Sequence, residues 1–147
     1  MDFAITIRSD LGKGSKSDIL NDLYKNIVNY FKDKDYGTGI QHFYIGCILV
    51  KTPPGYEYFF EVRKPRYQEL SKVKMPDNSI EELPGTYIYG IKPDYDLFVN
   101  ATEEDSKKIL FDEILASLSH LDKLPKRVKD FDKEQFKKDV TAFFEQY

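Results

Sequence analysis

The chain has 147 residues, 41% of them hydrophobic and 32% charged, with a formal net charge of −3. This length suits a single domain over residues 1–147 with one core, and leaves no room for two ordinary domains. The small negative charge argues against a general nucleic-acid binder, which needs clustered Lys and Arg, and no apolar run approaches the roughly 18 residues of a membrane-spanning helix.

The N-terminus and the cysteine content indicate the compartment. Residues 1–7 lack the basic region and the long apolar stretch of a signal peptide, so we expect a bacterial cytoplasm or another reducing compartment. Cys47 is the only cysteine, which excludes an internal disulfide and a cysteine-based zinc site. It lies within an apolar run, and we expect it to be a small buried hydrophobic residue.

The N-terminal part of the chain predicts a strand followed by a helix. Residues 3–8 alternate between apolar and polar side chains, which is typical of a strand with one buried face. The loop 12–17 contains glycines and lysines but has neither the P-loop nor the dinucleotide-binding spacing, so we favour a connector over an anion site. Apolar residues at helical spacing across 19–31 predict a helix on the sheet, capped by Ser15 or Ser17.

The middle of the chain is its most sheet-like part. The apolar run 43–50 predicts a central strand. The sequence Thr52-Pro53-Pro54-Gly55 predicts a turn into a second strand at 56–63, which makes a hairpin. Further strands are predicted at 66–75, 86–92 and 94–100.

Two helices are predicted in the C-terminal third. Thr102 caps an amphipathic helix with an acidic first turn, and Asp130 or Asp132 caps a final helix that contains Phe136 and Val140. Because strands follow one another without regular βαβ alternation, we predict an α+β fold. Its sheet is expected to be curved and mainly antiparallel, with about four to six strands, one N-terminal helix and two C-terminal helices.

The sequence predicts no catalytic, metal or cofactor site. His42 and His120 are the only histidines, and neither is spaced with another ligand in a way that suggests a metal. Asp94 and Asp96 flank Tyr95 and resemble paired carboxylates, but without a matching histidine or third carboxylate a turn is the simpler reading. An alternative function is a small-ligand or catalytic domain with a pocket between sheet and helices that contains His42.

Aromatic and acidic residues gather in the same part of the chain. Tyr58 shares a strand face with other aromatic residues, and Tyr87 and Tyr89 share a face of another strand. These tyrosines form either a contact surface or part of the core, and both readings stay open. Between residues 77 and 105, eight acidic residues oppose one lysine, a net −7, which would steer a basic partner. The predicted partner-binding residues are Tyr58, Tyr87, Tyr89, Glu81, Glu82, Asp94, Tyr95 and Asp96.

Four C-terminal segments resemble the C-terminal half of small bacterial immunity proteins, the cytoplasmic antidotes of polymorphic and contact-dependent toxin systems. The segments are DLFVNAT (96–102), KILFDEILASL (108–118), KDFD (129–132) and FKKDV (136–140). The resemblance implies a non-catalytic protein that binds a cognate toxin domain and blocks its active site, and many such toxins are basic nucleases. We therefore predict an immunity-type inhibitor with a protein partner. A further alternative is an adaptor that forms a homodimer through a sheet edge or a tyrosine-rich face.

Overall fold

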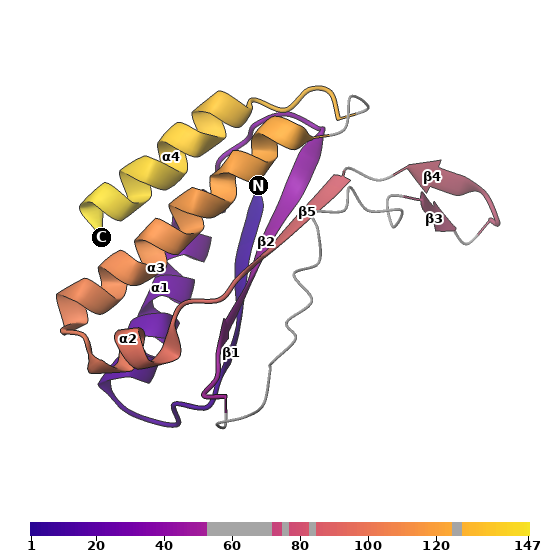
Figure 1. Cartoon of the computed structure of the whole chain (residues 1–147). Helices are drawn as coiled ribbons and strands as arrows, with labels where there is room; N and C mark the ends of the chain where they lie inside the picture. The colour runs from indigo at the N-terminus through magenta and orange to yellow at the C-terminus, as the bar shows by residue number, and fades with distance from the viewer. Residues whose placement is uncertain (53–71, 75–76, 83–84, 125–127) are drawn as a thin grey trace.

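The computed structural model describes residues 1–52, 72–74, 77–82, 85–124 and 128–147. Within them, three parallel strands form one open sheet in the order β1-β2-β5, with β2 at the centre. These strands are β1 (Asp2–Ser9), β2 (Ile40–Leu49) and β5 (Gly85–Ile91). A short antiparallel pair, β3 (Lys72–Lys74) and β4 (Ile80–Glu82), stands apart from this sheet (Figure 1).

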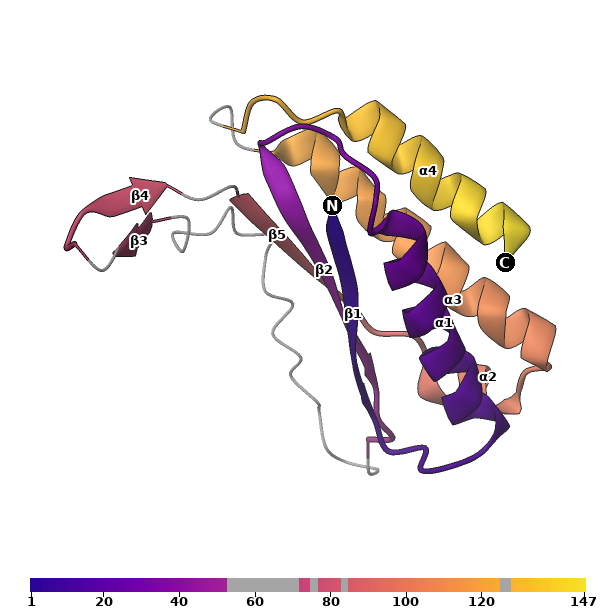
Figure 2. The ribbon, with the colours of Figure 1, turned by 180° about the vertical axis from the view of Figure 1, so that it is seen from behind.

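The long helices lie on one face of the sheet, as two opposite views show (Figures 1 and 2). They are α1 (Ser15–Phe31), α3 (Glu103–Ser117) and α4 (Lys133–Gln146). The short helix α2 (Tyr95–Asn100) links β5 to α3, and the 3₁₀ helix η2 (Leu118–Lys123) continues from α3. The α+β class is confirmed.

The predicted curved, mainly antiparallel sheet is wrong. The described sheet has three strands rather than about four to six, and all of them run parallel. The physical reason is that α1 carries the chain back along the sheet, so β2 enters in the same direction as β1. The hairpin partner predicted at 56–63 lies outside the described residues. The strand that pairs with β2 on its other side is β5, also in parallel.

The strand predicted at 94–100 is also wrong, because these residues form α2. The Asp94 side chain accepts a hydrogen bond from the Leu97 amide at 2.8 Å and caps the helix. At the other end, the Ala101 amide donates to the Leu97 carbonyl at 3.1 Å. A local cap after a proline decides the conformation of so short a segment.

The other helix caps are a mixed result. Thr102 caps α3 and Asp132 caps α4, as predicted, each accepting a hydrogen bond from the amide three residues further on. The predicted cap of α1 by Ser15 or Ser17 is wrong. That helix follows Gly14 and has no side-chain hydrogen bond at its N-cap.

The core lies between the sheet and the helices, and Phe136 of α4 stands at its aromatic centre. Its ring centroid lies 4.9 Å from that of Phe43 in β2 and 5.8 Å from that of Phe31 in α1. The predicted apolar stripe of α1 is confirmed, since its residues are buried. Cys47 is also buried as predicted, and burial raises the pKa of its thiol to about 12, with a smaller effect from Glu113.

The loop before β2 and the loop before α4 form a clasp, defined here as residues 36–39 against 129–132. The Gly39 amide donates to the Asp130 carbonyl, and the Asp132 amide donates to the Tyr36 carbonyl, each at 2.9 Å. The hydroxyl and amide of Thr38 both donate to the Asp130 carboxylate. The clasp therefore fixes where α4 begins relative to the sheet.

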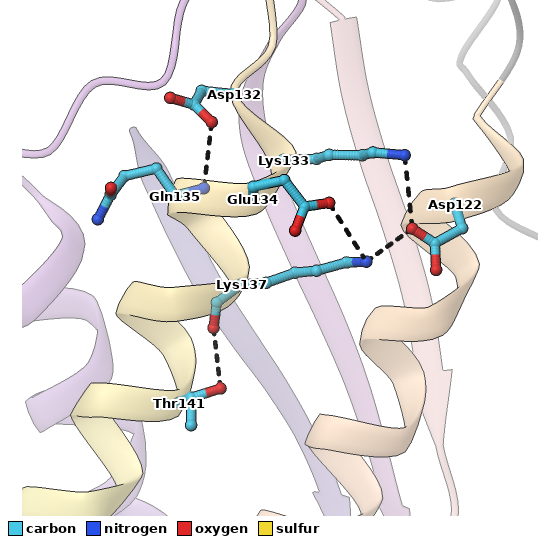
Figure 3. A network of polar contacts seen from close by, with 7 residues as sticks. All are labelled: Asp122, Asp132, Lys133, Glu134, Gln135, Lys137 and Thr141. Atoms are coloured by element: carbon cyan, nitrogen blue, oxygen red, sulfur yellow. Dashed lines mark hydrogen bonds and ion pairs between the residues drawn. The ribbon is translucent and has the colours of Figure 1, made fainter.

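A second contact holds α4 against η2, and Figure 3 shows it. Asp122 of η2 accepts hydrogen bonds from Lys137 at 2.6 Å and from Lys133 at 3.4 Å. The bond from Lys137 holds the pKa of the Asp122 carboxyl below its ordinary value. Because this carboxylate is largely exposed, the ion pair orients α4 more than it stabilises the fold.

Candidate functional site

Helix α2 presents one side chain to the core and the next to solvent. Phe98 is fully buried, whereas the adjacent Leu97 is 60% exposed. Among the large hydrophobic residues that the structure describes, Leu97 and Tyr24 of α1 are the exposed ones. An ordered helix therefore holds a leucine in water at a fixed place.

Two groups, one from α1 and one from α3, hold α2 in position. The ammonium group of Lys16, in the first turn of α1, donates to the Ala101 carbonyl at 2.5 Å and to the Ser106 hydroxyl. It also lies 5.7 Å from the centre of the Phe98 ring. The hydroxyl of Ser106, which is fully buried, donates to the Phe98 carbonyl at 2.9 Å. We call this set of contacts the Lys16 clamp.

The Lys16 clamp includes one of the two lysines of the loop 12–17, for which the sequence left a connector and an anion site as alternatives. Lys16 donates to a carbonyl and a hydroxyl of this same chain, so its ammonium is already occupied. Residues 10–14 connect β1 to α1.

A groove runs between α2 and α3, and Leu97 lies in its lining together with Ala101 and Ile109. We call it the α2–α3 groove. Carboxylates surround this apolar part, namely those of Asp94, Asp96, Asp105 and Asp112, together with the ammonium of Lys108. The groove thus combines an apolar floor with a predominantly negative rim.

The rim carboxylates differ in how they are engaged. Asp94 accepts the capping hydrogen bond of α2. Asp112 pairs with Lys108 at 2.7 Å, and this hydrogen bond raises the pKa of the lysine. Within the described part of the chain, the carboxylates of Asp96 and Asp105 accept no hydrogen bond and form no ion pair. These two remain available to a partner.

Tyr95 begins α2 and is partly buried. Burial, followed by a hydrogen bond to the Asp10 carboxylate, raises the pKa of its phenol. Asp10 also accepts a hydrogen bond from the Lys51 amide at 3.0 Å. Tyr95 therefore lies near the Asp10 carboxylate of the loop after β1, and it offers a partner only part of its ring.

The other predicted partner-binding residues lie elsewhere. Tyr89 of β5 faces the helices, half-buried, with its ring 4.6 Å from that of His120. Tyr87 belongs to β5, and Glu81 and Glu82 belong to β4. Tyr58 lies outside the described residues. The structure thus brings Asp94, Tyr95 and Asp96 together on α2 and places Tyr89 against the helix layer.

Sequence reasoning missed Leu97, Ile109 and Lys16. The available signal for Leu97 was the Pro93-Asp94 step, which starts a helix when the aspartate caps the amide three residues later. Read as a helix rather than a strand, residues 95–100 place Phe98 and Leu97 on different sides. No local pattern indicates Lys16, because its partner Ala101 lies 85 residues away.

The alternative function, a small-ligand or catalytic domain, was predicted to use a pocket that contains His42. The His42 side chain points to the sheet face opposite the helices, because its neighbour Phe43 is buried on the helix side. Its Nδ1 atom lies 2.9 Å from the Asp2 carboxylate, outside hydrogen-bond geometry, and its ring stacks on Tyr44 with centroids 6.3 Å apart. Among the residues described, no group of three or more His, Cys, Asp or Glu side chains is arranged to hold a metal ion. No described helix is long and apolar enough to cross a membrane.

Comparison with known proteins gives one match. The family model described as immunity protein 44 matches residues 1–146, which is nearly the whole chain. No curated protein and no solved structure matches.

Proposed function

This chain belongs to the immunity protein 44 family, and on that premise we propose that it neutralises a cognate bacterial toxin by binding to it, without catalysis. The family match supports a protein partner, namely the toxin of the same system. We further propose that the protein acts in the cytoplasm, as one domain over residues 1–147.

We propose that the acidic side of α2 and α3 faces the toxin and that the toxin surface is basic. Between Asp94 and Asp112, six acidic residues oppose two lysines, a net charge of −4 over 19 residues. A field of one sign speeds the encounter with a partner of the opposite sign and disfavours acidic surfaces. This charge density around an exposed leucine is the observation that carries the assignment of the surface.

We also propose that tyrosine side chains contribute to the toxin-binding surface. Tyr95 borders α2 and offers a partly exposed ring. The remaining predicted contacts stay in the proposal as candidates, namely Tyr58, Tyr87, Tyr89, Glu81 and Glu82. Tyrosine suits such a role because it supplies contact area and a polar group with few rotatable bonds.

Co-expression tests the proposed function. The toxin domain of the same system, which we expect a neighbouring gene to encode, is expressed in a sensitive bacterial host with or without this protein. We expect the protein to restore growth and to co-purify with the toxin domain. The proposal is refuted if it does neither while both proteins are present and folded.

Charge reversal tests the proposed surface. The variant Asp96→Lys/Asp105→Lys should lose most of its protection, because it turns two unpaired rim carboxylates into cations. Glu145→Lys is the matched control, since Glu145 is an exposed acid near the end of α4. Circular dichroism and urea unfolding of all variants check that the fold is retained. Equal protection by the groove variant and the wild type would contradict the surface assignment.

A homodimer remains a separate proposal. Light scattering at high protein concentration tests it, and a strict monomer would exclude it.

A further inference from the structure

We propose that the α2–α3 groove receives one segment of the toxin, which carries an aliphatic anchor residue with a lysine or arginine on each side. This inference rests on the toxin-binding function proposed above and names the part of the partner that the groove recognises.

The apolar floor calls for an apolar anchor. Leu97 is 60% exposed and is flanked in the groove by Ala101 and Ile109, both partly buried. A well-packed apolar contact at the centre of an interface contributes most when a rim excludes water from it. The groove is shallow, and charged side chains of α2 and α3 border its apolar part, so an aliphatic side chain docked on Leu97 would lie beside a charged rim.

The charges of the rim select what surrounds the anchor. Asp94 is engaged in the cap of α2, and Asp112 is engaged by Lys108. Asp96 on α2 and Asp105 on α3 line the groove, and within the described chain neither carboxylate accepts a hydrogen bond or forms a close ion pair, although Lys108 is an electrostatic neighbour of Asp105. Two exposed carboxylates, one from each helix, beside an apolar floor match an apolar residue that is flanked by cations. A neutral or acidic segment would leave both carboxylates desolvated without compensation.

The groove is held in shape before any partner arrives. The Lys16 clamp fixes the C-terminal end of α2 and the first turn of α3 to the start of α1. Phe98 anchors the other side of α2 in the core with no exposed surface. A site that is already ordered loses little conformational entropy on binding, so its contacts contribute more fully to affinity.

Titration calorimetry, for Kd, and stopped-flow kinetics, for the association and dissociation rates, with the purified toxin domain of the same system test the inference on the full-length chain. Leu97→Ala should raise Kd by about 10-fold, mainly through faster dissociation. Asp96→Asn/Asp105→Asn should slow association by about 10-fold at low salt and flatten its salt dependence. Tyr24→Ala is the matched control, because Tyr24 is the other exposed large hydrophobic side chain described and lies on α1. We expect its Kd to stay within about 2-fold of the wild type.

Hydrogen exchange of the complex gives a second readout. Amides of α2 and of the first two turns of α3 should exchange more slowly when the toxin domain is bound. If the wild type binds but these amides are unchanged and Leu97→Ala binds as tightly as the wild type, the groove inference is overturned and the proposed function stands. If the wild type does not bind at all, the proposed function fails and takes the inference with it.

Discussion

Replacing Lys16 by methionine is the most direct test of how the α2–α3 groove is held together. Methionine keeps an unbranched apolar side chain of similar length but removes the ammonium group, and with it the cation–π contact to the Phe98 ring. The variant therefore deletes the hydrogen bonds that this charged donor makes to the Ala101 carbonyl and the Ser106 hydroxyl, and a longer one to the Thr102 carbonyl at 3.4 Å. We expect α2 to open more often while the core stays intact.

The size of this effect follows from what each acceptor does after the change. The Ser106 hydroxyl still donates to the Phe98 carbonyl, so it keeps a partner. The Ala101 carbonyl is only partly buried and regains contact with water. One charge-assisted hydrogen bond is worth roughly 1.5–3 kcal/mol, and we expect a net loss of about 2 kcal/mol for the opening of α2. That corresponds to about a 30-fold increase in the open population.

Native-state hydrogen exchange measures that population. The reporters are the amide of Phe98, bonded to the Asp94 carbonyl at 3.0 Å, and the amide of Ala101, bonded to the Leu97 carbonyl at 3.1 Å. Both should exchange about 30-fold faster in Lys16→Met. Lys13→Met is the control, because Lys13 is an exposed lysine of the same loop. An increase below about 3-fold in Lys16→Met would show that the clamp does not hold α2.

Three other perturbations address the core, the clasp and its pH dependence. Phe136→Ala should lower the free energy of unfolding, measured in urea, by about 4 kcal/mol, because the buried ring fills the aromatic centre of the core. Phe136→Leu leaves a smaller cavity and should lower it by about 1.5 kcal/mol. Equal losses for the two variants would contradict this packing. Gly39→Ala should unfold at a much lower urea concentration than the wild type, because the added Cβ would lie 2.0 Å from a backbone carbonyl oxygen. Gly46→Ala is the control and should be tolerated, because the nearest atom to its Cβ lies at 3.8 Å. Similar urea midpoints for the two variants would argue against the clasp. The hydrogen bonds from Thr38 lower the pKa of the Asp130 carboxyl. Their contribution to the free energy of unfolding is therefore fully present above the ordinary aspartate pKa of about 3.9, and it is lost as the pH falls through the lowered pKa. The stability gap between wild type and Asp130→Asn should therefore narrow on acidification, and a gap independent of pH would refute the linkage.

The helices could be predicted from the sequence because their signals are local. Thr102 and Asp132 each cap a helix within three residues, and the apolar stripe of α1 repeats within its own length. The sheet could not be predicted in the same way. The direction in which β2 pairs depends on the crossover through α1 and on β5, which lies about 40 residues further along the chain. The strands at β1, β2 and β5 were predicted, whereas their pairing was not, and the strand predicted at 94–100 is a helix.

In the candidate site too, residues with a local sequence signal were predicted, and residues that depend on tertiary contacts were missed. Asp94, Tyr95 and Asp96 were found because acidic density is visible in the sequence. Leu97 was missed because its exposure depends on α2 being a helix that buries Phe98 instead. The contribution of Lys16 depends on a contact between segments 85 residues apart, which no periodicity reveals.

The exposed side chain of Leu97 does not stabilise the core, and we propose that it contributes to toxin binding instead. A single exposed leucine is common on protein surfaces and means little alone. Here, however, a six-residue helix too short to be stable by itself is fixed by a buried serine, a charged lysine and a buried phenylalanine. Those contacts concentrate on an element whose outward side chain adds nothing to the core. Leu97→Gln should therefore leave the free energy of unfolding within about 0.5 kcal/mol of the wild type. The same variant should weaken toxin binding about 10-fold in calorimetry, as expected for an interface anchor. If Leu97→Gln instead unfolded the protein at lower urea concentration and bound normally once folded, Leu97 would belong to the fold and not to the interface.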